Sequence, residues 1–308
     1  MKERSLTNIS ASVHQRLLNL ARAENRPFNE LLQLFAIERF LFRFSRSPHA
    51  GRFVLKGAQM LRVWEAPLER PTMDIDMLGR IENTVDTLVH VVRDCIKVEV
   101  EPDGVEFDPE SVSGEQIVKA AEYQGMRIRV RGTLGKIRLH VQIDFGFGDK
   151  VVPAPVWVEL PELLDLGSPR LLGYTPESTI AEKFQAMVAL DMANTRIKDF
   201  YDIWALARAR EFNGAILVAA IKATFERRGT SLPLESPTAL TEWFGADTEK
   251  QALWTAFLRK GRLDASGVTL EVVVGELRDF LMPPSVAAAR DESFEMEWKS
   301  TKGWTAKR

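Results

Sequence analysis

Two acidic residues at strand spacing, with a Lys-Gly turn upstream, are the residues of this chain best suited to chemistry. Asp74 and Asp76 alternate with apolar residues over 73–77, so both carboxylates should project from one face of a β-strand. Paired carboxylates favour a hard divalent cation such as Mg²⁺, which also takes phosphate oxygens. Upstream, Lys56 offers a positive charge, and Gly57 allows close backbone approach to a phosphate. The pattern suggests metal-assisted phosphoryl or nucleotidyl transfer, although an Asp-x-Asp pair alone is also typical of a solvated edge or turn.

The composition is that of a globular protein with no membrane partner. The 308 residues are 45% hydrophobic and 27% charged, with a formal net charge of −2, so any basic surface must be local. The single cysteine, Cys95, excludes an internal disulfide and a cysteine-rich zinc site. The first residues lack the apolar core of a signal peptide, and no apolar run is long enough to span a bilayer. We therefore expect a cytoplasmic protein.

Apolar residues at helical spacing predict helices, with Ser10 and Thr175 as N-caps. The segments are 9–24, 29–46, 83–97, 176–192, 196–210, 213–229, 247–260 and 270–281. Alternation predicts an antiparallel pair of strands at 125–131 and 136–145. Short strands and loops are expected over 98–118, a Pro-rich linker over 151–176, and a packed arm at the Trp-containing end of the chain.

Asp144 ends the second predicted strand on its polar face, before the Gly-rich residues 146–148. A third carboxylate there could complete a metal triad with Asp74 and Asp76, or it could serve as a strand-end cap.

Arginines recur on two predicted elements. Arg127, Arg129 and Arg131 alternate with apolar residues on the first strand, and they could contact an RNA backbone or balance charge on a solvated sheet face. Arg39, Arg43 and Arg46 lie on one stripe of the helix over 29–46, where a solvated face is expected and a role in RNA or phosphate binding is the alternative.

A second group of charged residues lies on two consecutive predicted helices. Lys183 falls on a different stripe from the apolar residues of its helix, and Asp199 and Asp202 share one side of the next helix. Helices joined by a short break tend to pack antiparallel, which would bring Lys183 towards Asp199 or Asp202. Such a pair could bind a triphosphate or position an acceptor hydroxyl, and a plain salt bridge is the alternative.

With both groups in view, the chain resembles the AbiEii/AbiGii toxin family, MenT-like nucleotidyltransferases of the DNA polymerase β-like superfamily. The resemblance covers nearly the whole chain and rests on the order of six segments, FVLKGAQML, RPTMDIDM, VQIDFGFGD, ESTIAEKFQAMV, NTRIKDFYDIWAL and ATFERRGT. It implies an α+β fold. A polymerase β-like nucleotidyltransferase domain over 1–160 would carry a mixed or antiparallel sheet flanked by helices, and a mainly helical domain over 161–308 would complete the active site.

The resemblance also implies an activity and its partners. The protein would be a toxin held in check by a cognate antitoxin, and it would transfer a nucleotide from a nucleoside triphosphate to RNA, with a tRNA 3′ end as the expected acceptor. Asp74 and Asp76 would hold Mg²⁺ or Mn²⁺ in that reaction, with Asp144 as a third ligand or as the base for the acceptor hydroxyl.

Other positions would bind the triphosphate by the same resemblance. Lys56, Gly57 and Thr72 would line the phosphate cradle, Lys183 would contact the triphosphate, and Asp202 would complete the fourth family motif with Asp199 nearby.

The turn departs from the superfamily pattern, because Gly57-Ala58 replaces the usual Gly-Gly or Gly-Ser. The lost Ser hydroxyl would remove one phosphate or metal contact. Two alternatives therefore stand beside the transferase: a nucleotide-binding regulatory or interaction protein whose catalysis has lapsed, and a metal-dependent nuclease.

Overall fold

A computed structural model describes residues 6–64, 74–119, 123–263 and 267–307 of the chain. The chain divides into two compact units. Unit 1 comprises Met1–Val63, Pro71–Gly148 and Val156–Gly173, and unit 2 comprises Trp64–Arg70, Asp149–Pro155 and Tyr174–Arg308. The fold is α+β, as predicted.

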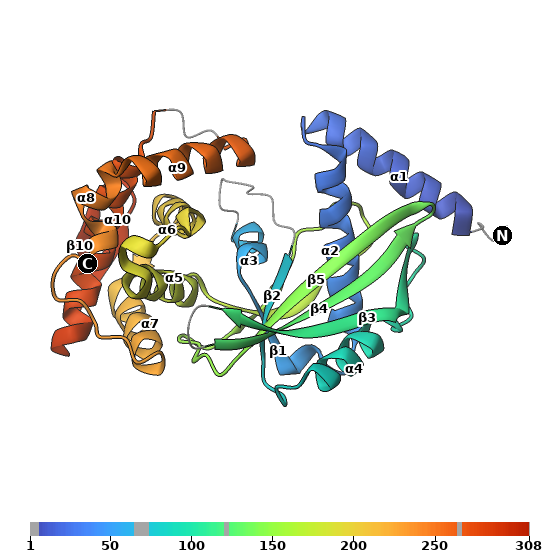
Figure 1. Cartoon of the computed structure of the whole chain (residues 1–308), viewed down its shortest axis with the longest axis horizontal. Coiled ribbons are helices and arrows are strands. Elements are labelled where there is room, and N and C mark those ends of the chain that lie inside the picture. The colour runs from blue at the N-terminus through green and yellow to red at the C-terminus, as the bar shows by residue number, and fades with distance from the viewer. Residues whose placement is uncertain (1–5, 65–73, 120–122, 264–266, 308) are drawn as a thin grey trace. The chain divides into compact units, whose positions relative to one another are not determined.

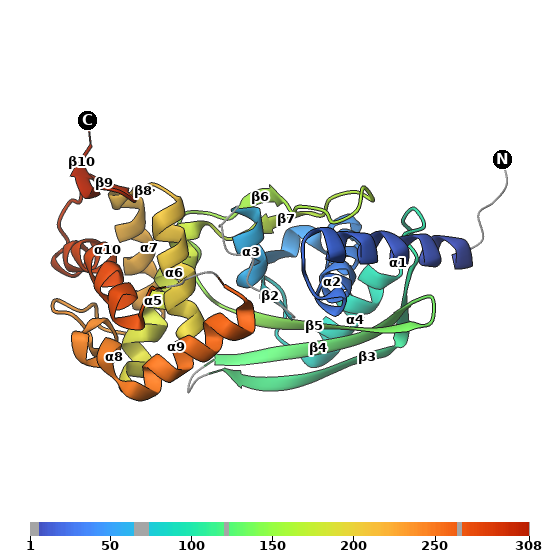
Figure 2. The same ribbon diagram turned by 90° about the horizontal axis from the view of Figure 1, so that it is seen from above.

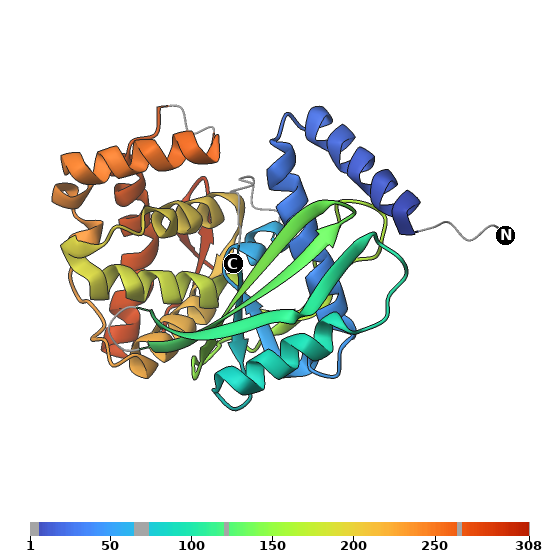
Figure 3. The same ribbon diagram turned by 45° about the vertical axis from the view of Figure 1, so that its right-hand side comes forward.

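Unit 1 is built on a seven-stranded mixed sheet in the order β3-β4-β5-β2-β1-β7-β6 (Figure 1). Its strands are β1 (Phe53–Lys56), β2 (Asp74–Gly79), β3 (Val105–Lys119), β4 (Tyr123–Leu134), β5 (Ile137–Phe147), β6 (Val156–Glu159) and β7 (Arg170–Gly173). β2 runs parallel to β5 and β1 parallel to β7, whereas the other neighbouring pairs are antiparallel. The long strands β3, β4 and β5 twist together (Figure 3).

The helices of unit 1 are α1 (Leu6–Ala23), α2 (Phe28–Arg46), α3 (Ala58–Val63) and α4 (Val85–Ile96). α2 packs against β5, α4 packs against β3 and β4, and the two helices contact each other (Figure 2). The sheet face beneath them is apolar because Val141, Ile143 and Phe145 of β5 alternate with polar residues, as the sequence period predicts. The opposite face of β5 is therefore left to polar side chains.

Three expectations for unit 1 are wrong. Residues 105–119 form one long strand instead of short strands and loops, because β3 pairs along most of β4 with a single register shift. The supposed linker contains β6 and β7, which close one edge of the sheet. Ser10 lies inside α1, where its hydroxyl donates to the Gly104 carbonyl at 3.1 Å instead of capping the helix.

Unit 2 is mainly helical. Its helices are α5 (Pro176–Leu190), α6 (Ile197–Ala209), α7 (Gly214–Arg227), α8 (Glu242–Ala246), α9 (Thr248–Gly261) and α10 (Leu270–Arg290). The Thr175 hydroxyl caps α5 by accepting from the Ser178 N–H, which confirms the predicted start of that helix. α5 contacts α6 and α7, and α10 contacts α6, α7 and α8.

The C-terminal arm packs onto unit 2, as expected. Strands β9 (Met296–Lys299) and β10 (Gly303–Ala306) form a three-stranded sheet with β8 (Phe212–Asn213). The Trp304 ring stacks on Phe280 with a centroid separation of 5.8 Å, and the Trp298 indole N–H donates to the Ala207 carbonyl at 2.7 Å. Trp298 is buried, Trp304 is half-buried, and the Trp304 indole N–H donates to the Phe280 carbonyl at 3.0 Å, so both N–H donors are satisfied.

Candidate active site

A row of charged residues crosses five strands of the unit 1 sheet. Lys56 on β1 lies opposite Asp76 on β2, and Asp76 lies in register with Asp144 on β5. Asp144 in turn lies opposite Arg127 on β4, which lies opposite Glu115 on β3. Residues in register on neighbouring strands share a face and are about 4.8 Å apart. The row therefore brings together Lys56, Asp76, Asp144 and Arg127, although Lys56 and Asp144 are 88 positions apart in the sequence. Glu115 lies at the far end of the row.

Asp74 lies on the same face, one row further along the sheet. It is in register with Gln142 on β5, whose side-chain amide donates to Asp74 Oδ1 at 3.1 Å. Ile75 is fully buried between the two carboxylates, so Asp74 and Asp76 both point away from the apolar face. The predicted shared face of the Asp-x-Asp pair is confirmed, and Gln142 is a neighbour that the sequence analysis did not single out.

Gly57 lies against the Asp76 carboxylate. Its φ is +72°, a conformation that L residues with side chains rarely adopt, and a Cβ at this position would overlap Asp76 Oδ2. Glycine is therefore required here by both backbone conformation and space. α3 begins at Ala58, directly after this turn, and Thr72 lies outside the described residues.

Asp144 forms a bidentate ion pair with Arg127. Arg127 Nε donates to Asp144 Oδ1 at 2.8 Å and Arg127 Nη2 donates to Oδ2 at 2.9 Å, with 5% of the Asp144 side chain exposed. The hydrogen bonds to Asp144 raise the pKa of Arg127, and the nearby charges of Asp74 and Glu115 raise it further. Among the described residues, no three His, Cys, Asp or Glu side chains are grouped as a metal site. Asp144 as a third metal ligand stays a prediction.

The other β4 arginines also have carboxylate neighbours. Arg129 Nη2 lies 2.8 Å from Glu115 Oε1, and Arg131 Nη2 lies 3.8 Å from Asp108 Oδ2. These side chains are half or more exposed, so their ion pairs are weak and can exchange with other anions. Contact with RNA by this strand stays a prediction.

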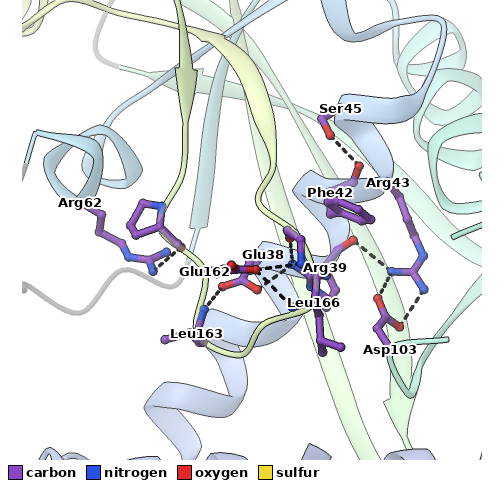
Figure 4. Close-up of polar contacts among 12 residues, drawn as sticks. Glu38, Arg39, Phe42, Arg43, Ser45, Arg62, Asp103, Glu162, Leu163 and Leu166 are labelled. Atoms are coloured by element: carbon purple, nitrogen blue, oxygen red, sulfur yellow. Dashed lines mark hydrogen bonds and ion pairs between the residues drawn. The ribbon is translucent and has the colours of Figure 1, made fainter. Parts of the chain in front are cut away.

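The α2 arginines are buried, so the expectation of a solvated or RNA-binding stripe is wrong for Arg39 and Arg43. Arg39 pairs with Glu38 at 2.7 Å and donates to the carbonyls of Leu166 and Gly167 (Figure 4). The segment between β6 and β7 thus covers this side of α2.

Arg43 makes a similar buried contact one turn further along α2. It forms a bidentate pair with Asp103 at 2.7 and 3.0 Å (Figure 4). At the neighbouring Glu38–Arg39 pair, burial raises the pKa of the Glu38 carboxyl, and the positive charge of Arg39 partly offsets that rise. Both arginines therefore hold unit 1 together and do not face solvent.

In unit 2, Lys183 lies between two buried carboxylates. Its Nζ donates to Asp199 Oδ1 at 2.5 Å and to Asp202 Oδ2 at 2.8 Å, which confirms the predicted approach of α5 and α6. Both aspartates are 1% exposed, and Arg196 Nε lies 2.6 Å from Asp199 Oδ2. The cluster therefore holds two cations and two carboxylates.

The titration of this cluster follows from its charges. Burial lowers the pKa of Lys183, but Asp199 and Asp202 outweigh that effect and raise it above its ordinary value. Burial raises the pKa of Asp199, and Lys183 and Arg196 outweigh it, so the net shift is downward. Lys183 and Asp199 therefore each favour the charged form.

Arg228 is a further charged residue of unit 2 to which the sequence analysis assigned no role, although it lies in the segment ATFERRGT. Its guanidinium reaches Asp149 at 3.2 Å and Glu182 at 3.3 Å, and it donates to Gln185 Oε1 at 2.9 Å. Tyr174 also donates to Glu182, at 2.8 Å. These contacts tie the segment after β5 to the helix that carries Lys183.

The comparison with protein families now decides the identity of the chain. The family described as nucleotidyl transferase AbiEii toxin, type IV TA system, matches residues 39–281. The chain belongs to the AbiEii family. The matched region includes the β2 carboxylates, the Lys-Gly turn and the Lys183 cluster, so this AbiEii protein is a member of a nucleotidyltransferase toxin family of type IV toxin–antitoxin systems.

Two solved structures match this AbiEii protein at low sequence identity. One is JHP933 from Helicobacter pylori, with 14% identity and a TM-score of 0.42 over 82% of this chain and 89% of that one. The other is a nucleotidyltransferase candidate from H. pylori, with 16% identity and a TM-score of 0.41 over 85% and 94% of the two chains. No curated protein shows a significant match. Within the described residues, no helix is both long and apolar enough to cross a membrane.

Proposed function

We propose that this AbiEii protein is the toxin of a toxin–antitoxin pair and transfers a nucleoside monophosphate from a nucleoside triphosphate to RNA, with a tRNA 3′ end as acceptor. Pyrophosphate is the leaving group. The observation that carries the proposal is the turn between β1 and α3, where Gly57 lies against the Asp76 carboxylate and Lys56 lies opposite Asp76.

Asp74 and Asp76 fit a Mg²⁺ or Mn²⁺ ion by the chemistry of their donors. Their carboxylates lie on one face of β2, and the missing Cβ of Gly57 lets the Asp76 carboxylate lie against the turn that follows β1. Mg²⁺ is usually held by one or two carboxylates together with substrate phosphates and water. When bound, the ion would neutralise charge that develops on the transferred phosphoryl group and on pyrophosphate.

The remaining residues of the proposed site bind the substrates. Lys56 supplies a positive charge to the triphosphate, and the backbone N–H groups at Gly57 can approach its oxygens because glycine has no side chain of its own. Thr72 would complete this phosphate cradle.

Lys183 would contact the triphosphate, held in a fixed direction by Asp199 and Asp202. The exposed Arg129 and Arg131 would contact the RNA backbone, since their pairs with carboxylates at the surface are weak.

The test is a transfer assay with Mg²⁺, each α-labelled nucleoside triphosphate and total tRNA. We expect label in RNA, reduced by about 10³-fold or more in Asp74→Ala and Asp76→Ala because metal-bound charge stabilisation contributes several kcal/mol. Glu82→Ala, which removes an exposed carboxylate from the loop after β2, is the matched control and should transfer normally.

Two other results would identify a different function, and two more would contradict the roles given to particular residues. Triphosphate binding without transfer would show a lapsed enzyme, and shortened RNA would show a nuclease. Full transfer by Asp76→Ala would contradict the proposed metal site. If Lys183→Ala left both triphosphate binding and transfer intact, the role given to Lys183 would be wrong.

A further inference from the structure

The Arg127–Asp144 pair lies directly beside the proposed metal ligands. Asp144 is in register with Asp76 on the neighbouring strand, about 4.8 Å away across the sheet. The pair is therefore close enough to affect any cation held by the β2 carboxylates.

The geometry of the pair commits both Asp144 oxygens to Arg127. The two parallel hydrogen bonds, at 2.8 and 2.9 Å, match the fork of a guanidinium to the plane of a carboxylate. With 5% of its side chain exposed, Asp144 has little contact with water. Turning this carboxylate towards a cation on β2 would break at least one of these two charge-assisted bonds, so the ion pair opposes that movement.

The pair also sets the net charge of the site. Arg127 offsets the charge of Asp144, and among the described residues of β1 and β2 at this place, Asp74, Asp76 and Lys56 have formal charges that sum to −1. Affinity for a hard cation rises with the number of charged ligands, so a site with two carboxylates and a lysine binds a free cation weakly. The same low charge repels an incoming triphosphate less than three carboxylates would.

We propose that Arg127 withholds Asp144 from the divalent cation, so that the nucleotide-free protein has a weak two-carboxylate site and the cation enters together with the triphosphate. This inference rests on the proposed function, because it takes Asp74 and Asp76 as the metal ligands. In this role Arg127 is a positioning residue, because it acts on the cation through Asp144.

The test is calorimetric titration of Mn²⁺ into the full-length protein without nucleotide. Arg127→Gln frees Asp144 and removes a positive charge, so it should tighten Mn²⁺ binding about tenfold and weaken the binding of metal-free nucleoside triphosphate. Arg131→Gln is the matched control on the same strand and face, and it should leave Mn²⁺ affinity unchanged because its partner is Asp108. Unchanged or weaker Mn²⁺ binding by folded Arg127→Gln would overturn the inference.

If Arg127→Gln does not fold, a double variant can test whether Asp144 is a ligand. Arg127→Gln with Asp144→Asn removes both charges, and the two amides can still hydrogen-bond to each other. If Asp144 is not a ligand, this variant binds Mn²⁺ within about twofold of the wild type, because the net charge is the same. A loss of about tenfold or more would show that Asp144 coordinates the cation, and would overturn the inference.

Asp76→Ala separates this inference from the proposed function. If Asp76→Ala abolishes Mn²⁺ binding while Arg127→Gln does not tighten it, the metal site stands and the role of Arg127 fails. If Mn²⁺ binds equally well to Asp76→Ala, the cation is held elsewhere and both fail.

Discussion

Replacing Lys183 by Met should destabilise unit 2 strongly, because the change leaves two carboxylates buried without the cation between them. Lys183 Nζ lies 2.5 Å from Asp199 and 2.8 Å from Asp202, and each carboxylate is 1% exposed. Removing one partner of a buried ion pair typically costs about 3–5 kcal/mol. Arg196 continues to neutralise Asp199 at 2.6 Å, so we expect a loss near the lower end of that range.

The loss should depend on pH in a direction that the pKa shifts determine. In the wild type, the pKa of Asp199 is lowered, so its stabilising contribution is present above the unfolded pKa of about 4 and is lost as the pH falls through the folded value. In Lys183→Met, burial of Asp199 remains and the main opposing charge is gone, so the pKa of Asp199 should rise. The stability difference between wild type and variant should therefore shrink as the pH falls from about 7 to 5.

Urea-induced unfolding at both pH values measures this difference. Lys222→Met is the matched control, because Lys222 lies at the same 2.5 Å from Asp291 but the pair is at the surface. The control should show no measurable loss of stability at either pH. A loss in Lys183→Met no larger than in the control, or one that does not change between pH 7 and pH 5, would refute the reasoning.

Three further changes test other parts of the structure. Gly57→Ala should lower transfer about 100-fold by displacing the β2 carboxylate, whereas Gly51→Ala, with open space around its Cβ, should not. Arg43→Met should cost about 3–5 kcal/mol in urea unfolding, because it leaves a buried carboxylate unpaired, and Arg46→Met on the exposed side of the same helix should cost much less. Cys95 should resist thiol reagents at pH 8 until urea unfolds the protein, because burial raises its pKa to about 12; rapid modification of the folded protein would contradict this.

Local patterns were enough to predict those parts of the site that depend on one element or on two neighbouring ones. The two-residue period of a strand places Asp74 and Asp76 on one face wherever that strand lies. Helical spacing and a short connection were likewise enough to predict that Lys183 approaches Asp199 and Asp202, because consecutive helices joined by a short break pack side by side.

Burial of charged residues could not be predicted in the same way. A stripe of arginines on a helix has the same sequence pattern whether water or another segment covers it. Arg39 and Arg43 are buried because the segment between β6 and β7 and the start of β3 lie over α2, and both segments are distant in sequence. The short strands β6 and β7 were mistaken for a linker because four residues are too few to show a period among prolines.

The partner of Asp144 depends on register, which no local pattern carries. A shift of one residue between β4 and β5 would move Arg127 to the opposite face, and Asp144 would then lose its counter-charge. The same strand-end Asp can therefore be a metal ligand in one protein and an ion-pair partner in another, according to the residue opposite it on the next strand. In this chain that residue is Arg127, whose Nε and Nη2 both donate hydrogen bonds to Asp144. For this reason the presence of Asp144 in the sequence does not show that it binds the metal. The Mn²⁺ affinity of Arg127→Gln, compared with that of the wild type, tests whether Arg127 keeps Asp144 from the cation.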